Sequence, residues 1–145
     1  METIRVIKSK NELNGTAYVE LLPGIYKDQC WNENSLFFDE EVFGYLENII
    51  SRHVPTYDHY AFTEISSETW GNIVADFQLL ESKLPEFHSV DDMAIEVGFL
   101  SYRSKIRFAE NFNENKAAFE RLLSETSVWI SKKASQHGCV TVLGL

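Results

Sequence analysis

The segment that most constrains the fold is the C-terminal one, where an amphipathic helical pattern runs directly into a short apolar run. Asn113 followed by Glu114 is typical of a helix N-terminus, and Gly138 stands where a left-handed residue commonly ends a helix. The next five residues, 139–143, are apolar enough for a strand in the interior of a sheet. The chain must therefore combine helices with a sheet.

Other strands are predicted upstream. Residues 16–22 and 59–65 alternate between apolar and polar positions, which is typical of half-buried strands. In the second of these, Tyr60, Phe62 and Glu64 point to one side. Residues 4–7 form a short β-branched stretch that reads as an edge strand.

Two further helices follow from capping and periodicity. Asp39 is a suitable N-cap, and the helix that it begins must end before Pro55, because the residue before a proline is driven out of the helical region. Ser66 or Ser67 can cap the next helix, which extends toward Pro85. The core positions of the chain are predicted to include Phe62, Trp70, Phe77 and Trp129.

Residues 89–108 have two interpretations. Ile95, Val97 and Phe99 alternate as in a strand, whereas Asp91 and Asp92 could begin a helix. We favour a strand, because a glycine at position 98 would destabilise a helix interior. With at least three helices interleaved with short strands, the chain is predicted to be one α+β or α/β domain over residues 1–145, with a small central sheet.

The net charge is strongly negative. The chain has 22 acidic and 13 basic residues, for a formal charge of −9. Nucleic acids and anionic membranes attract clustered lysine and arginine, so both partners are disfavoured. The charge suits a basic protein partner, which it would steer electrostatically. The alternative is that the acidity only keeps the protein in solution.

No complete catalytic motif occurs in the chain. It lacks the GxSxG, GxGxxG and GxxxxGK[ST] patterns, and Cys30 and Cys139 belong to no CxxC pair. The nearest candidate for an enzyme is a site built from His53, Asp58, His59 and Glu64, although the His-x5-His spacing is not a common zinc signature. We therefore expect a protein that is not an enzyme and needs no cofactor or metal.

A binding surface is the other possibility. Carboxylates interspersed with aromatic side chains would match lysine and arginine on a partner, with the aromatic residues as anchors. Trp31 belongs to the same pattern. The predicted partner-binding residues are Glu33, Asp39, Glu40, Glu41, Tyr45, Glu47, Tyr57, Asp58, Tyr60, Glu64, Glu68, Asp91 and Asp92.

Three stretches together carry a family resemblance. They are residues 38–41 with the helix ending before Pro55, residues 57–65 with the following Trp70, and residues 139–145 after a helix containing Trp129. These stretches resemble small bacterial proteins of unassigned function and the immunity proteins of contact-dependent and polymorphic toxin systems. The resemblance implies an acidic, single-domain cytoplasmic protein that binds and blocks a basic toxin domain, often a nuclease. It implies no specific interface residues, because these interfaces differ from pair to pair.

The remaining expectations concern location and assembly. The first residues form no long apolar run, so neither a signal peptide nor a membrane-spanning helix is expected. Two cysteines are no disulfide framework, which agrees with a reducing cytoplasm. We expect a monomer or weak dimer.

Overall fold

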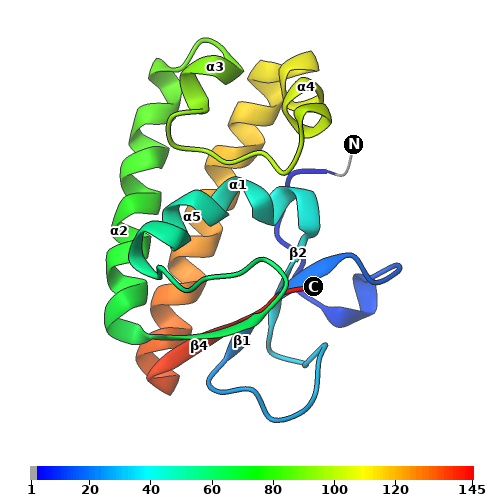
Figure 1. The fold of residues 1–145 in the computed structure, drawn as a ribbon, viewed down its shortest axis with the longest axis vertical. Helices are drawn as coiled ribbons and strands as arrows, with labels where there is room; N and C mark the ends of the chain where they lie inside the picture. The colour runs from blue at the N-terminus through cyan, green and yellow to red at the C-terminus, as the bar shows by residue number, and fades with distance from the viewer. Residues whose placement is uncertain (1–2) are drawn as a thin grey trace.

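The computed structural model describes residues 3–145 and shows an α+β domain (Figure 1). Its four strands form one antiparallel sheet in the order β2-β1-β4-β3. The strands are β1 (Tyr18–Pro23), β2 (Leu36–Asp39), β3 (Phe62–Ser66) and β4 (Cys139–Leu143). The helices are α1 (Glu40–His53), α2 (Ser67–Lys83), α3 (Val90–Met93), α4 (Tyr102–Glu110) and α5 (Phe112–His137), with 3-10 turns η1 (Lys10–Glu12) and η2 (Leu84–Glu86).

The sheet confirms that β4 is an interior strand, because it pairs with β1 on one side and β3 on the other. The purely antiparallel pairing makes the domain α+β rather than α/β. Strand β2 was not predicted, since it has only four residues and enters α1 without a turn. The predicted strand at residues 4–7 is reduced to a single bridge between Ile7 and Phe37.

Capping residues begin the helices largely where the sequence indicated. The Asp39 carboxylate accepts a hydrogen bond from the Glu41 amide, and the Ser66 hydroxyl accepts one from the Thr69 amide. Gly138 ends α5 in the left-handed conformation, as predicted. The N-cap of α5 is Asn111 rather than Asn113, because the helix begins two residues earlier.

The main core lies between one face of the sheet and helices α1, α2 and α5. Val19, Leu21, Val140 and Val142 are fully buried on this face. Trp70 packs here as predicted, and its indole N–H donates to the Val140 carbonyl at 2.9 Å. A single core thus joins the first strand to the last.

The opposite face of the sheet is covered by the loop of residues 24–35. Leu22, Thr141 and Leu143 are buried on this side. The Thr141 hydroxyl donates to the Gly24 carbonyl at 2.7 Å, which fixes the start of the loop to the sheet. Phe62 lies at the uncovered margin of this face and is 46% exposed, so its prediction as a core residue is wrong.

The strand predicted around residues 95–99 is also wrong. These residues instead form a turn, in which Ile95 is 85% exposed, and an irregular stretch, and together they join α3 to α4. The Ser89 and Ser101 hydroxyls accept hydrogen bonds from amides in the first turns of the two helices. Gly98 serves close packing, because a Cβ there would lie 3.0 Å from the Gly44 carbonyl oxygen.

Tyr45 contradicts the expectation that it lies at a surface. Its side chain is fully buried, and its ring makes edge contacts with Phe99, Phe108 and Phe119. The sequence underestimated this burial because residues 95–110 were not expected to fold over α1. Among residues 3–145, no helix combines the length and apolar character needed to cross a membrane.

Candidate functional site

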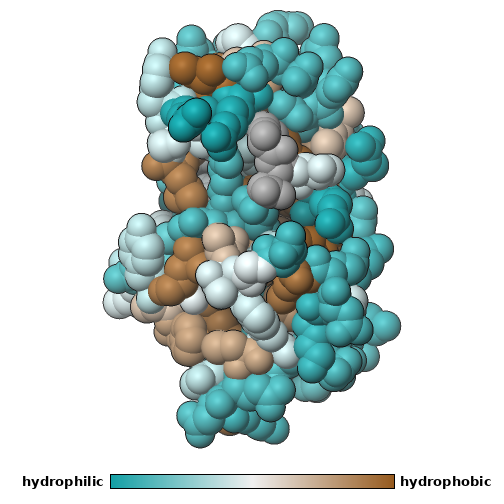
Figure 2. Space-filling model, turned by 90° about the vertical axis from the view of Figure 1, so that its right-hand side faces the viewer, coloured by the Kyte–Doolittle hydropathy of each residue, from teal (hydrophilic) through white to brown (hydrophobic). Residues whose placement is uncertain are grey.

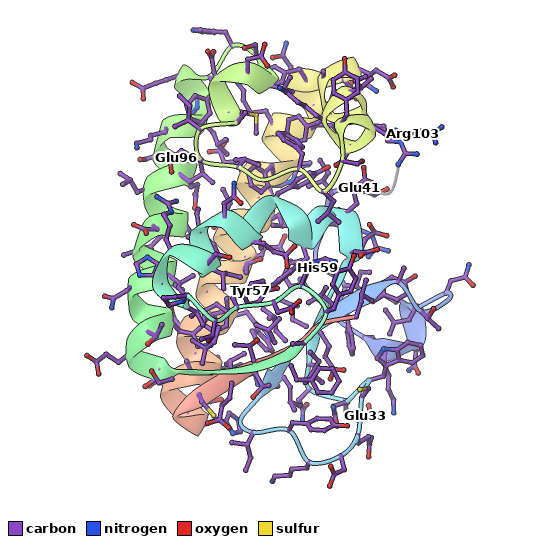
Figure 3. All side chains as sticks on the ribbon, viewed as in Figure 1. Glu33, Glu41, Tyr57, His59, Glu96 and Arg103 are labelled. Atoms are coloured by element: carbon purple, nitrogen blue, oxygen red, sulfur yellow. The ribbon has the colours of Figure 1, made fainter. Side chains whose placement is uncertain are left out.

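His59 lies at the centre of a half-buried cluster beneath α1 (Figure 3). Its Nε2 is 2.6 Å from Glu40 Oε2, and its Nδ1 is 2.7 Å from Glu47 Oε1. Glu40 and Glu47 lie seven residues apart on α1, which places them about two turns apart on one face of the helix. The imidazole therefore bridges the helix to the loop that follows it.

The electrostatics of the cluster favour the charged imidazole. Burial by itself lowers the pKa of His59, but the hydrogen bonds to Glu40 and Glu47 and their negative charges outweigh it, so the pKa lies above its ordinary value. In the protonated form both ring nitrogens donate, one to each carboxylate. The three groups then carry one net negative charge.

Tyr57 completes the cluster. Its hydroxyl donates to Glu47 Oε2 at 2.5 Å. Burial raises the pKa of Tyr57 strongly, and the adjacent Glu47 carboxylate raises it further. The phenol therefore stays neutral and acts as a fixed donor.

The contacts of the cluster restrain the loop that follows α1. A general base needs a free nitrogen within reach of a substrate proton, and both nitrogens of His59 are occupied by carboxylates. The backbone adds to the restraint, because the His59 carbonyl accepts from the Leu145 amide and the Ala61 carbonyl from the Gly144 amide. The loop is thus fixed to both α1 and the C-terminal segment.

The four residues proposed as an enzymatic site do not form one cluster. His53 Nε2 is 2.6 Å from Asp76 Oδ2 of α2, whereas the His59 ring forms its hydrogen bonds with Glu40 and Glu47. No hydrogen bond or ion pair within residues 3–145 joins any two of His53, Asp58, His59 and Glu64. In the same part of the chain, no group of three or more His, Cys, Asp or Glu is arranged to hold a metal ion.

An exposed aromatic group adjoins the His59 cluster, and we call it the aromatic face. It consists of four aromatic side chains and one leucine, which are between 36% and 71% exposed: Tyr26, Trp31, Tyr60, Phe62 and Leu145. Figure 2 shows hydrophobic side chains gathered in the lower half of this side of the molecule, the half that holds the sheet. Scattered apolar residues are normal at a surface, whereas a contiguous group often marks an interaction site.

One ring contact joins two members of the aromatic face, and a second ring contact joins Tyr60 to the His59 cluster. The Tyr60 ring packs edge-on against His59, with the ring centroids 4.8 Å apart. Tyr26 makes the same kind of contact with Phe62 at 4.9 Å. Phe62 is opposite Leu143 in the sheet, and a shallow pocket beside Leu143 is also lined by Trp31 and Leu145.

A buried carboxylate positions the part of the aromatic face that comes from the 24–35 loop. Glu20 of β1 is only 2% exposed. It accepts hydrogen bonds from the amides of Trp31 and Asn32, from the Asn32 side chain and from the Ser35 hydroxyl. Because four donors converge on one carboxylate, the loop has a defined conformation around Trp31, whose φ is +60°.

Some of the predicted binding residues lie at this face. Asp58 and Tyr60 are exposed at the turn before β3, where the Asp58 carboxylate accepts from the Tyr60 amide at 2.8 Å. Glu64 is exposed on the same side of β3 as Phe62. Glu40 is half-buried at the edge of the His59 cluster. The three carboxylates, Glu40, Asp58 and Glu64, border the aromatic face with negative charge, and Tyr60 belongs to the face itself.

The other predicted binding residues either stabilise the fold or lie away from the aromatic face. Glu47 and Tyr57 are tied up in the cluster, Asp39 caps α1, and Glu41 pairs with Arg107. Asp91 and Asp92 belong to α3, at the end of the molecule opposite the sheet (Figure 1). Glu33 lies on the 24–35 loop and pairs with Lys10 of η1. Glu68 is exposed in the first turn of α2.

Several residues of the site were not found from the sequence. The anchoring role of Glu20 has no local signature, because its partners lie 11 to 15 residues away. No local sequence pattern marked Tyr26 or Leu145 as part of a binding surface either. For Phe62 the alternation of the strand did indicate exposure, since it placed the side chain on the same side as Glu64. Its apolar character nevertheless led to its prediction as a core residue.

The comparisons give no relative on which to base a function: the chain matches no protein-family model, no curated protein and no solved structure. The function must therefore be argued from the chain's own residues. What those residues provide is a preorganised surface of exposed aromatic rings bordered by carboxylates.

Proposed function

We propose that this chain is an immunity-type protein that binds and neutralises a basic toxin domain, most simply a nuclease, through the aromatic face and its acidic border. The observation that carries the proposal is the gathering of Tyr26, Trp31, Tyr60 and Phe62 on one exposed side next to Asp58 and Glu64. In this function the chain acts in the cytoplasm as a monomer or weak dimer, and it needs no cofactor, nucleic acid or membrane.

The composition of the face supports protein binding. Buried tyrosine and tryptophan residues supply much of the free energy of many protein–protein interfaces. The exposed carboxylates Asp58 and Glu64 can pair with lysine and arginine at the rim. A partner with exposed basic residues around an apolar pocket fits both features.

Preorganisation supports the same conclusion. Ordering a loop on binding costs free energy, and a loop that is already fixed avoids that cost. The His59 cluster fixes the loop that presents Tyr60, and Glu20 fixes the loop that presents Trp31. Both loops therefore meet a partner in a defined conformation.

The net charge of −9 supports a basic partner through long-range attraction. Electrostatic steering raises association rates, and salt screens it over a Debye length of about 10 Å at 0.1 M ionic strength. The complex should form faster as salt is lowered. This dependence separates specific steering from simple apolar adhesion.

The test is binding to a panel of basic nuclease toxin domains, measured as association and dissociation rates at about 50 mM and 300 mM NaCl. A toxin bound by the wild type should lose affinity by about 100-fold or more with the double variant Tyr60→Ser and Phe62→Ser. The matched control is Ile95→Ser with Tyr102→Ser, which removes one aliphatic and one aromatic side chain, both more exposed than the test pair, at the other end of the molecule.

The proposal fails if no basic domain of the panel forms a complex at low salt, or if the control variant weakens binding as much as the test variant. A growth assay adds a functional readout. Co-production of the wild type should protect cells from the bound toxin, and the Tyr60→Ser and Phe62→Ser variant should protect them less.

A further inference from the structure

A groove runs between α5, the N-terminal segment and the 24–35 loop. Its first part has a volume of about 570 Å³, and its walls include Val6, Leu36 and Trp129. Its second part, of about 380 Å³, continues toward Lys27 and His137. The two parts share the same middle residues, so they form one elongated hollow whose size is typical of ligand-binding sites.

The groove is positive in a protein that is otherwise strongly negative. Its two carboxylates are already paired, Glu125 with Lys8 at 3.3 Å and Glu33 with Lys10 at 3.0 Å. Three more lysines line it without any ion pair or hydrogen bond to residues 3–145, and they are Lys27, Lys132 and Lys133. The groove therefore presents uncompensated ammonium groups along its length.

One wall of the groove is apolar. Val128 and Trp129 lie on the stripe of α5 that also carries Glu125 and Lys132, at spacings of three and four residues. Val128 is 69% exposed, and Trp129 is half-buried. An occupant must therefore offer apolar as well as acidic groups.

Backbone groups at the rim of the groove are also unpaired. Ile7 exchanges two hydrogen bonds with Phe37, each 2.8 Å long. In such an antiparallel pair the N–H and C=O groups of the flanking residues point away from the partner strand. Those of Val6 and Lys8 bond to nothing within residues 3–145. An extended peptide can pair with them as an added strand.

We propose that this groove binds an acidic, extended segment of another protein, with apolar side chains against Val128 and Trp129 and carboxylates on Lys27, Lys132 and Lys133. A nucleic acid suits the groove less well. Its phosphates would continue beyond the lysines into the field of a chain of charge −9, and the groove offers only the rings of Trp129 and His137 among its lining residues for stacking bases. The site is separate from the aromatic face and would take a partner of opposite charge.

The test is selection from a displayed library of random peptides of about 12 residues, long enough in extended form to span the groove. Selected sequences should combine Asp and Glu with apolar residues. Their affinity, measured by fluorescence anisotropy, should fall at least about tenfold with Lys132→Glu and Lys133→Glu. The matched control is Arg103→Glu with Arg121→Glu, which makes the same change in net charge at exposed positions outside the groove.

Each outcome decides the proposal. It is overturned if the library yields no acidic peptide, if both double variants weaken binding equally, or if a single-stranded DNA of the same length binds more tightly than the selected peptide. Far-UV circular dichroism confirms that the variants are folded. The variant Tyr60→Ser with Phe62→Ser should leave peptide binding unchanged, which separates this site from the proposed toxin-binding face.

Discussion

At the scale of single residues, His59 couples protonation to stability. Its pKa in the folded protein is raised, although burial alone would lower it, because Glu40 and Glu47 hydrogen bond to the ring. Folding therefore strengthens proton binding at this site. The resulting stabilisation is complete below the unfolded pKa of about 6.5 and is lost as the pH rises through the folded pKa.

The variant His59→Gln should remove this dependence. At pH 6 we expect it to lower the free energy of unfolding by about 1–3 kcal/mol, because two half-buried carboxylates lose a charged donor. The difference from wild type should shrink between pH 6 and pH 9, as measured by urea unfolding. His88→Gln, at an exposed histidine, should behave like wild type throughout; a constant difference for His59→Gln would contradict the role of the charge.

Gly144 illustrates a different constraint, that of space. A Cβ at this position would lie 2.4 Å from the His59 carbonyl oxygen and 2.6 Å from that of Ala61. Gly144→Ala should therefore destabilise the protein by about 1–3 kcal/mol. Gly71→Ala should do the opposite and stabilise it by about 0.5–1 kcal/mol, because a Cβ there meets nothing within 4 Å and alanine favours α2. Thermal unfolding should show a lower melting temperature than wild type for Gly144→Ala and a higher one for Gly71→Ala.

At the scale of elements, the 24–35 loop depends on a residue from β1. Glu20→Gln replaces one carboxylate oxygen with a donor that faces other donors, at a site that is 2% exposed. We expect a loss of about 1–3 kcal/mol and faster hydrogen exchange at the Trp31 and Asn32 amides. Glu81→Gln on α2 is the control, outside this network. Unchanged exchange in Glu20→Gln would show that the loop holds its conformation without the carboxylate.

Some helices and strands could be predicted from the sequence and others could not. The difference is whether an element depends on residues within its own segment or on contacts with distant ones. Helices α1, α2 and α5 follow from caps and periodicity within one segment, and β4 follows from an apolar run after Gly138. Strand β2 and the packing of α4 on Tyr45 depend on distant partners. The site divides in the same way: the exposure of Asp58 and Tyr60 was predicted, whereas the contacts of Glu20 and His59 with residues 11 to 19 positions away were not.

At the scale of the whole molecule, charge is distributed unevenly. Carboxylates border the aromatic face at Asp58 and Glu64, whereas Lys27, Lys132 and Lys133 along the α5 groove have no ion pair within residues 3–145. The 24–35 loop contributes to both surfaces, because Trp31 lies in the aromatic face and Lys27 lines the groove. One loop therefore separates two surfaces that suit partners of opposite charge.

The same imbalance predicts how salt acts on the isolated chain. A charge of −9 repels itself, and most of the excess carboxylates are exposed, so screening should relieve the repulsion. The half-buried pairs around His59 are screened less. We expect the free energy of unfolding to rise by about 1 kcal/mol between 20 mM and 300 mM NaCl, as measured by urea unfolding at pH 7.5. Salt would then stabilise the free protein while slowing its capture of a basic partner; a fall in stability would mean that the surface ion pairs outweigh the net repulsion.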